Sequence, residues 1–269
     1  MSPRISIIVP TLNSGSTLRA CLESIRSQEF RDFEIIVVDG PSTDDTPEIA
    51  KSFGARYYFH AGSLPDARNF GARQSAGRIL VSLDSDMVAG PGLLDEICRA
   101  GTDSGPLIIP EKGAGRSLIS RCEALEKECT IGHEPMESAR VFSREAFESA
   151  GGYDPDLLFG EDRDFHERVS EGRTVGRTTS VVYHVQDHVG FWGLIRKSFV
   201  YGRSARLFFE KRRKRGRPLP ADRLGFFLRW KTLLSDPPLA VCMLFLKAAE
   251  YWAFGSGYLV SFFMPYRKR

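Results

Sequence analysis

Cysteine is scarce in this sequence, and its pattern excludes two classes of small stabilised protein. The five cysteines are an odd set without a C-x-x-C pair: Cys21, Cys98, Cys122, Cys129 and Cys242. A disulfide scaffold normally has an even number of cysteines and a zinc knuckle has closely spaced pairs, so neither is supported. We expect reduced thiols in an intracellular protein.

The sequence also lacks internal repeats, low-complexity tracts and a long apolar run near its start. The apolar run at residues 5–9 is too short for the core of a signal peptide, so we expect the N-terminus to stay in the cytosol. Apolar residues make up 42% of the 269 residues and charged residues 26%. This composition is typical of a soluble globular protein and not of a disordered or polytopic membrane chain.

The known glycine-rich phosphate loops are missing after the first apolar segment. That position reads PTLNSGS, which is neither the G-x-G-x-x-G dinucleotide fingerprint nor a G-x-x-x-x-G-K-[ST] loop. Dehydrogenase and P-loop functions therefore lose most of their support. A sugar-phosphate nucleotidyltransferase stays open as an alternative, although it normally has a glycine- and lysine-rich loop here.

Charge is distributed unevenly along the chain. Residues 193–231 contain 13 Lys and Arg against two acids, for +11, whereas residues 1–192 sum to −10. An acidic body suggests a cation or a polar ligand, and a basic aromatic tail suggests an anionic partner. A simple solvated helix face is the alternative explanation for the basic segment. No nucleic-acid recognition motif accompanies it.

Short β-branched segments alternate with helical patterns over the first part of the chain. We expect strands at residues 5–10, 33–39, 55–60, 79–83 and 107–110, and helices at 46–53, 65–76, 92–100 and 117–128. A further helix, capped by Asn13 or Ser14, places Leu18, Leu22 and Ile25 on one face. This alternation predicts an α/β nucleotide-binding fold whose ligands bind at the carboxyl ends of the strands.

Two carboxylates follow the strand predicted at residues 79–83. Asp84 and Asp86 are separated by one residue, so in extended backbone both side chains point the same way. Mg²⁺ and Mn²⁺ prefer oxygen ligands and often bind one or two carboxylates together with substrate phosphates. The D-x-D triplet therefore predicts a divalent metal site.

Asp39 ends another apolar strand, where its carboxylate can accept hydrogen bonds from the N–H edge of uracil or guanine. The polar residues that follow it are explained equally well by turn and helix-cap chemistry without a ligand; they are Ser42, Thr43, Asp44 and Asp45.

Five successive segments resemble the family 2 glycosyltransferases of the GT-A fold. They are IVPTLN, CLESI, FEIIVVDGPSTDDT, ARNFGARQSAGRILVSLDSD and GGYDPDLLFGEDRDFHERV, in the family's own order over residues 5–184. The resemblance implies a mixed central sheet and inverting transfer from a nucleotide-diphospho sugar with Mg²⁺ or Mn²⁺. We therefore expect a GT-A catalytic domain at residues 1–190.

The resemblance also implies roles for individual residues. Pro10, Thr11 and Asp39 would line the nucleoside pocket, and Arg68 would lie near the diphosphate. Asp84 would face the ribose, and Asp86 would hold the metal. The family's frequent V-D-D reads Val38-Asp39-Gly40 here, which leaves uridine and guanosine both open.

The segment Gly160-Glu161-Asp162 matches the family's E-D motif, whose aspartate is the general base on the acceptor hydroxyl. Asp162, with Glu161 beside it, is therefore the candidate catalytic group. The alternative is that these acids only complement the dipole of a helix at its first turn. His184 is at a position where related enzymes often have a histidine near the metal, and His188 is a weaker candidate of the same kind. A structural role for either histidine stays open.

Residues 191–269 form a basic and aromatic helical region that we expect to associate with membranes. The apolar segment 239–264 is interrupted by Lys247 and Glu250, which disfavours a full membrane span. Basic residues 211–217 suit anionic headgroups, so we expect a peripheral or shallowly inserted position on the cytoplasmic face. A transmembrane helix, an oligomer interface and a non-catalytic membrane-docking module are alternatives.

A lipid-linked acceptor, such as a polyprenyl phosphate, fits this placement of the tail. Arg229-Trp230 matches the end of the Q-x-x-R-W motif of processive synthases, but Phe226 replaces its glutamine. That difference favours transfer of a single sugar.

Overall fold

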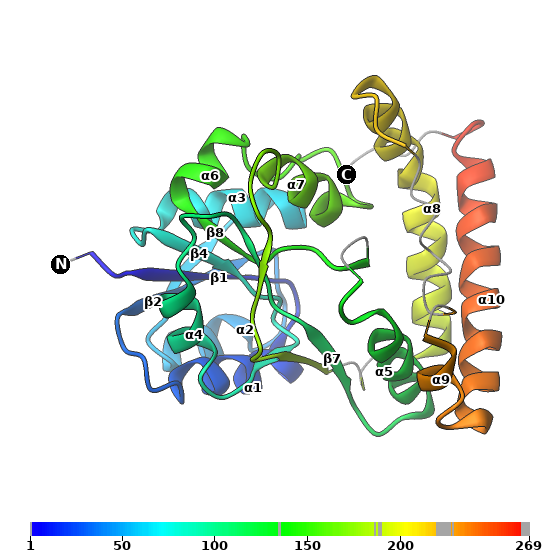
Figure 1. Ribbon diagram of the computed structural model, residues 1–269, viewed down its shortest axis with the longest axis horizontal. Coiled ribbons are helices and arrows are strands. Elements are labelled where there is room, and N and C mark those ends of the chain that lie inside the picture. The colour runs from blue at the N-terminus through cyan, green and yellow to red at the C-terminus, as the bar shows by residue number, and fades with distance from the viewer. Residues whose placement is uncertain are drawn as a thin grey trace. The chain divides into compact units, whose positions relative to one another are not determined.

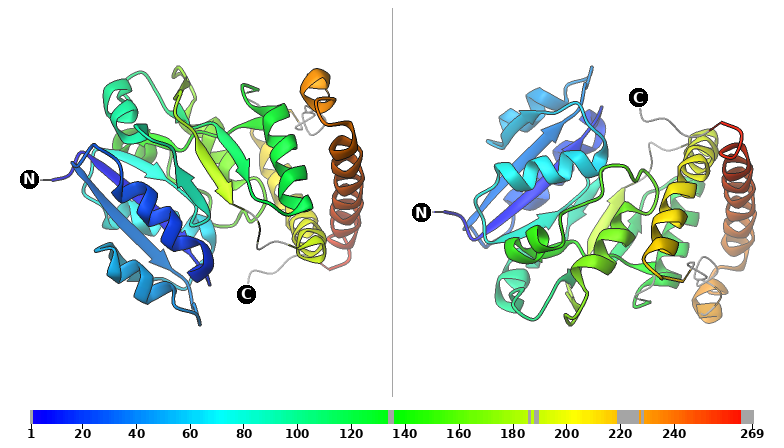
Figure 2. Two further views of the ribbon diagram at one scale, coloured as in Figure 1. Left: turned by 90° about the horizontal axis from the view of Figure 1, so that it is seen from below. Right: turned by 90° about the horizontal axis from the view of Figure 1, so that it is seen from above.

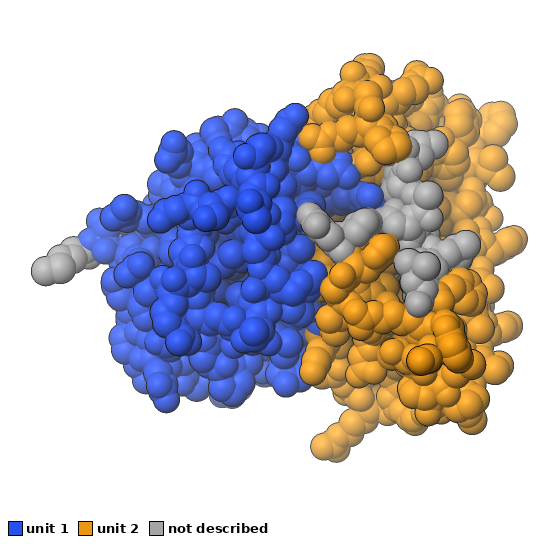
Figure 3. Space-filling model, viewed as in Figure 1, with its two compact units in different colours: residues 1–111, 138–155, 162–185 blue, residues 112–137, 156–161, 186–269 orange. Residues whose placement is uncertain are grey.

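The structure, a computed structural model, describes residues 2–133, 136–185, 187, 190–218, 227 and 229–264. The chain forms two compact units (Figure 3). Unit 1 contains residues 1–111, 138–155 and 162–185, and unit 2 contains residues 112–137, 156–161 and 186–269. The predicted domain boundary at residue 190 stays a prediction.

A seven-stranded mixed sheet is the centre of unit 1. Its order is β3 (Arg56–Phe59), β2 (Phe33–Asp39), β1 (Ile5–Thr11), β4 (Ile79–Ser82), β8 (Val141–Ser143), β6 (Leu107–Ile108) and β9 (Gly176–Arg177). The first four strands are parallel, and β8 is antiparallel to both β4 and β6. The predicted α/β class with a mixed sheet is confirmed.

Helices cover both faces of this sheet (Figures 1 and 2). One face carries α1 (Gly15–Arg26), α2 (Thr46–Ser52) and α4 (Leu93–Ala100), and the other carries α3 (Leu64–Gln74), α6 (Arg144–Ser149) and α7 (Glu161–Val169). Because side chains alternate along a strand, Ile7 and Val9 of β1 enter the first core and Ile8 enters the second. Burial on both faces explains why the strand sequences are almost continuously apolar.

A second pair of strands returns the chain to the end of β4. Strand β5 (Met87–Ala89) is antiparallel to β10 (Val182–Val185), with His184 opposite Met87. This register places His184 beside Asp86, although the two residues are far apart in sequence.

The start of α1 differs from the prediction. Ser14 occupies the cap position, but its side chain does not cap the helix, because its Oγ accepts hydrogen bonds from the Leu12 amide and the Ser85 hydroxyl. Asp44 from the next loop accepts the Gly15 amide at 2.9 Å instead. Asp44, which is distant in sequence, therefore caps α1 in place of Asn13 or Ser14. This contact also supports the turn and cap explanation for Asp44.

Unit 2 is mainly helical. It contains α5 (Leu118–Thr130), α8 (Phe191–Lys214), α9 (Trp230–Leu233) and α10 (Pro237–Val260), with β7 (Glu111–Ala114) at its first boundary. Helices α8 and α10 approach closely because glycines stand at their contact. A Cβ at Gly202 would meet the Phe254 carbonyl oxygen at 2.0 Å, and one at Gly257 would meet the Phe199 carbonyl oxygen at 2.1 Å.

Helix α10 is long and apolar enough to cross a membrane by length and composition. Its central charge is nevertheless on the packed side. Lys247 is 5% exposed, and its Nζ lies 2.6 Å from Glu123, 2.6 Å from Glu126 and 3.1 Å from Glu250. Three carboxylates thus surround one buried ammonium. Burial would lower the pKa of Lys247, but these carboxylates raise it.

This cluster predicts that unit 2 is more stable in mild acid. Burial raises the pKa of Glu250 from 4.5 to about 7, and it raises the pKa of Glu126 as well. Because the folded value is the higher one, the stabilising contribution is complete below pH 4.5 and is lost as the pH rises through about 7. The Glu250 contribution corresponds to about 3 kcal/mol. Urea unfolding between pH 5 and pH 8 measures it.

Glu250→Gln should flatten this pH dependence, because the amide does not titrate. Glu128→Gln is the matched control, since Glu128 is exposed on α5 outside the cluster. Equal slopes for the wild type and Glu250→Gln would contradict the assignment.

Candidate active site

The predicted nucleoside residues meet at the carboxyl ends of β1 and β2. Thr11 and Asp39 are paired in register, and Pro10 pairs with Val38 one step earlier. Asp39 is 1% exposed and accepts three hydroxyl donors: Thr11 at 2.7 Å, Ser42 at 2.7 Å and Tyr57 at 3.0 Å. Burial, together with the bond to Asp39, raises the pKa of Tyr57 to about 12, so the phenol stays a donor.

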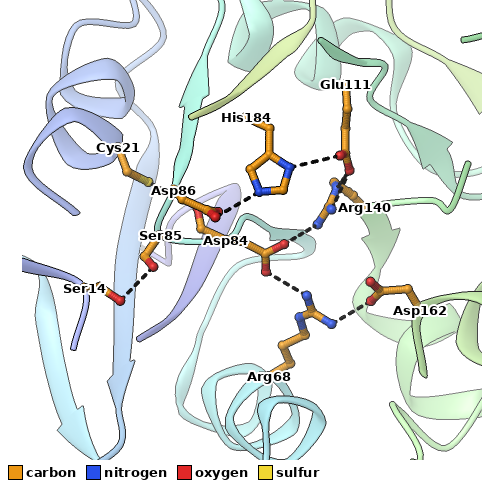
Figure 4. Close-up of polar contacts among 10 residues, drawn as sticks. All are labelled: Ser14, Cys21, Arg68, Asp84, Ser85, Asp86, Glu111, Arg140, Asp162 and His184. Atoms are coloured by element: carbon orange, nitrogen blue, oxygen red, sulfur yellow. Dashed lines mark hydrogen bonds and ion pairs between the residues drawn. The ribbon is translucent and has the colours of Figure 1, made fainter. Parts of the chain in front are cut away.

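Arg68 connects the D-x-D triplet to the E-D motif (Figure 4). It comes from α3 and is 1% exposed. Its Nη2 donates to Asp84 Oδ1 at 2.7 Å, and its Nη1 donates to Asp162 Oδ1 at 2.6 Å. The ring of Tyr153 lies 5.1 Å from the guanidinium carbon. One buried cation therefore positions two carboxylates from distant parts of the sequence.

The turn before Tyr153 explains how that ring reaches Arg68. Asn69, the next residue of α3, donates to the Tyr153 carbonyl and accepts the Tyr153 amide, both at 2.8 Å. Gly152 has φ of 67°, and a Cβ there would meet Asn69 Oδ1 at 2.6 Å. Glycine is thus required both by the backbone conformation and by the close approach.

A second arginine faces Asp84 from the other side. Arg140 Nη1 lies 3.4 Å from Asp84 Oδ2, and Arg140 Nε donates to Glu111 at 2.8 Å. Burial would lower the pKa of Arg140, but Glu111 and Asp84 raise it. Burial would raise the pKa of Asp84, yet Arg68 and Arg140 lower it to about 2. Asp84 is therefore ionised at neutral pH, with each oxygen facing a guanidinium.

Asp86 and His184 form a third contact pair in this site (Figure 4). His184 Nε2 lies 2.9 Å from Asp86 Oδ2, and His184 Nδ1 lies 3.7 Å from Glu111 Oε2. No group of three or more His, Cys, Asp or Glu that could hold a metal occurs in the described part of the chain. A carboxylate and an imidazole side by side nevertheless fit a divalent cation that takes its other ligands from a diphosphate.

The structure brings most of the sequence candidates together in unit 1. Arg68, Asp84, Asp86, Asp162 and His184 form one polar network, and Pro10, Thr11 and Asp39 lie at the ends of β1 and β2. Glu161 is buried at the first position of α7. His188 and Phe226 lie outside the described residues. The roles assigned to all these side chains stay predictions.

Three members of the network were not predicted from the sequence. Arg140 precedes β8, Glu111 begins β7, and Tyr153 follows a glycine pair. For Arg140 and Glu111 the only local signal was a charged residue beside a short apolar strand, which is common on protein surfaces. The role of Arg140 depends on the antiparallel insertion of β8 next to β4, and that of Tyr153 depends on the turn at Gly152; periodicity shows neither.

Known proteins share parts of this sequence and its fold. The sequence model of glycosyl transferase family 2 matches residues 6–108. A PGL/p-HBAD biosynthesis glycosyltransferase of Mycobacterium bovis is 42% identical over 92 residues, which are 32% of this chain and 36% of that protein. Glycosyltransferase AglE of Haloferax volcanii is 37% identical over 93 residues, 31% of each chain. This chain thus spans about a third of the length of these curated relatives.

Two solved structures are similar over almost the whole chain. S. aureus TarS residues 1–349, in complex with UDP-GlcNAc, has a TM-score of 0.58 at 15% identity and covers 98% of this chain and 93% of its own. Mannosyltransferase PcManGT from Pyrobaculum calidifontis, in complex with GDP-Man and Mn²⁺, has a TM-score of 0.57 at 20% identity and covers 99% and 83%. Residues 6–108 therefore match glycosyl transferase family 2, and the fold of the chain is similar to that of these two glycosyltransferase structures.

Arg68→Gln should destabilise unit 1 by about 3 kcal/mol, because it leaves two carboxylates without their shared cation. This value is at the lower end of the usual cost of breaking a buried ion pair, because the Asp162 side chain is 35% exposed. Urea unfolding measures the change. Arg73→Gln, on the exposed side of the same helix, should shift stability by less than about 0.5 kcal/mol. Similar small effects of both substitutions would show that the Arg68 network does not stabilise the fold.

Proposed function

We propose that this chain is an inverting glycosyltransferase that moves one sugar from a nucleotide-diphospho sugar to an acceptor hydroxyl or phosphate. The observation that carries this proposal is the Arg68 bridge. It holds Asp84, at the strand end where a donor would bind, and Asp162, a carboxylate able to serve as base. The family match over residues 6–108 supports the donor class.

The donor's nucleoside would bind at Pro10, Thr11 and Asp39. Asp39 already accepts hydroxyl donors, so its carboxylate is oriented to accept an N–H from uracil or guanine. The similar structures contain UDP-GlcNAc in one case and GDP-Man in the other. Both nucleotide classes are therefore donor candidates for this chain, and Asp84 would meet the ribose.

Asp86 and His184 are the residues that would hold Mg²⁺ or Mn²⁺. Each oxygen of Asp84 faces an arginine, so Asp84 is the less suitable metal ligand of the D-x-D pair. When bound, the cation supplies positive charge that stabilises the departing nucleoside diphosphate. The 2.9 Å contact between Asp86 and His184 keeps both donor groups at one place.

Asp162 would remove the proton from the acceptor. Its Oδ1 is held by Arg68, and the side chain is 35% exposed, so the carboxylate is oriented while still accessible. The acceptor oxygen then attacks the anomeric carbon from the side opposite the nucleoside diphosphate, and the configuration inverts. Glu161 would support this role as the preceding residue of the motif.

The acceptor is proposed to be lipid-linked, on the cytoplasmic face of a membrane with an anionic surface. Four exposed apolar residues of α10 are separated by 4, 7 and 7 positions and so share one side of the helix: Val241, Phe245, Trp252 and Leu259, at 67%, 73%, 76% and 65% exposure. We call these four residues the α10 stripe. Lys247 is on the packed side, which favours a helix lying on the membrane over one crossing it.

Asp162→Asn should keep donor affinity and lose turnover by at least about 100-fold, because the base acts on the acceptor. Asp86→Ala should instead weaken the metal-dependent binding of the donor. Calorimetry with UDP-N-acetylglucosamine and GDP-mannose in Mn²⁺ or Mg²⁺ measures affinity, and release of nucleoside diphosphate measures turnover. Loss of donor affinity in Asp162→Asn equal to that in Asp86→Ala would assign Asp162 a structural role.

The double substitution Phe245→Ser and Trp252→Ser should weaken binding to phosphatidylglycerol vesicles by about tenfold or more, since each ring loses its burial in the interface. Cosedimentation measures this, and higher salt should weaken binding further. Leu118→Ser removes an exposed apolar side chain from α5, outside the stripe, and should change little. Unchanged vesicle binding in the double variant would remove the stripe from the membrane model.

A further inference from the structure

A groove of about 600 Å³ lies between α8 and α10 in unit 2. Its lining combines arginines with aromatic rings: Arg206, Arg213, Arg217, Phe209, Tyr258 and Phe262. We call it the arginine–aromatic groove. Its volume is within the range of small-molecule sites.

The lining follows from helical spacing. On α8, Phe209 and Arg213 fall three and seven positions after Arg206, so they share one face. On α10 and the turn after it, Tyr258 and Phe262 are four positions apart. The groove is therefore formed mainly by one face of each helix.

The aromatic side of the groove is a continuous wall. The ring of Tyr258 lies 5.8 Å from that of Phe209 and 5.3 Å from that of Phe262. The Arg206 guanidinium carbon is 4.9 Å from the Phe262 ring centre. These contacts hold the rings and leave an apolar surface that suits a hydrocarbon chain.

The charged side of the groove is net positive. Three arginines face a single acid, Glu210, whose carboxylate accepts from Arg206 Nε at 2.8 Å. Arg206 is thus largely compensated. Arg213 is exposed and has no ion-pair partner among the described residues. A ligand anion would gain most from the end of the groove where Arg213 stands.

The sequence of the basic segment 211–217 suggested a continuous charged surface. In the structure, not all of its cations are available to a ligand. Arg212 is 3% exposed and donates to the Pro218 carbonyl at 2.8 Å, and Lys211 pairs with Asp156 at 3.3 Å. Two of the consecutive cations therefore serve the fold. Selectivity for an anion depends on which cations line the groove.

We propose that the arginine–aromatic groove binds the phosphate of an anionic lipid, with the lipid chain against the aromatic wall. Leu259 and Met264, close in sequence to the lining residues Tyr258 and Phe262, are 65% and 66% exposed and add apolar surface for the rest of the chain. Free phosphate would use the arginines but not the rings. The inference extends the proposed membrane association from a surface to a specific site, and it rests on that proposal only for the class of ligand.

The test uses the full-length chain and lipids that are monomeric in water, so no membrane or sugar donor is involved. Calorimetry compares dihexanoyl phosphatidic acid with inorganic phosphate and with dihexanoyl phosphatidylcholine. The phosphatidic acid should bind at least about tenfold more tightly than either comparison compound, because only it offers both a phosphate monoester and two chains. Equal binding of inorganic phosphate would overturn the lipid part of the proposal.

Two pairs of adjacent residues provide matched variants. Arg213→Glu should weaken phosphatidic acid binding by about tenfold or more, whereas Lys214→Glu, with the same charge change outside the lining, should change it less than about threefold. Phe262→Ala should weaken it by about tenfold, and Phe263→Ala, next to it but outside the lining, should not.

Equal losses in Arg213→Glu and Lys214→Glu would show general electrostatic attraction and would overturn the site. Equal effects of the two phenylalanine substitutions would remove the aromatic wall from it. Loss of vesicle binding with retained binding of monomeric lipid would contradict the membrane surface and leave the groove. Loss of monomeric lipid binding with retained vesicle binding would contradict the groove alone. The groove and the proposed membrane surface are therefore tested separately.

Discussion

The guanidinium of Arg68 is a positive charge removed from water, and the arrangement of the candidate active site depends on how that charge is compensated. A buried cation without partners costs several kcal/mol, so its two carboxylates must stay in place. Asp84 is 16 positions after Arg68 and Asp162 is 94 positions after it. The bridge therefore links the loop after β4 to the first turn of α7. Arg140 repeats the arrangement from the opposite side of Asp84 and connects it to Glu111 and His184.

Much of the fold could be predicted because local patterns and tertiary burial agree. Strand β2 has its predicted bounds, and α4 and α5 begin and end within about two residues of theirs. Asp84 and Asp86 were found because a strand end places such pairs at the ligand edge. Arg140 and Glu111 were not found, because their partners are set by an antiparallel strand pairing that has no local periodicity.

The same limit applies to charge. The sequence shows that Lys247 interrupts an apolar segment, and it suggests an insertion penalty. It does not show that three glutamates surround the ammonium, two of them on α5. Likewise Arg212 counts as a surface cation in composition, yet its guanidinium is buried against the backbone of Pro218. The net charge of a segment can be read from the sequence, but whether a particular charged side chain is free to bind a ligand cannot.

The glycines between α8 and α10 have a consequence for how the second unit can change during evolution. At Gly202 and Gly257 the helices are in backbone contact, so their separation there is independent of side-chain size. The groove further along the same helices can then exchange its lining residues without altering the helix spacing. Such a scaffold can acquire new ligand preferences by single substitutions, while the two glycines preserve the dimensions that any ligand must fit.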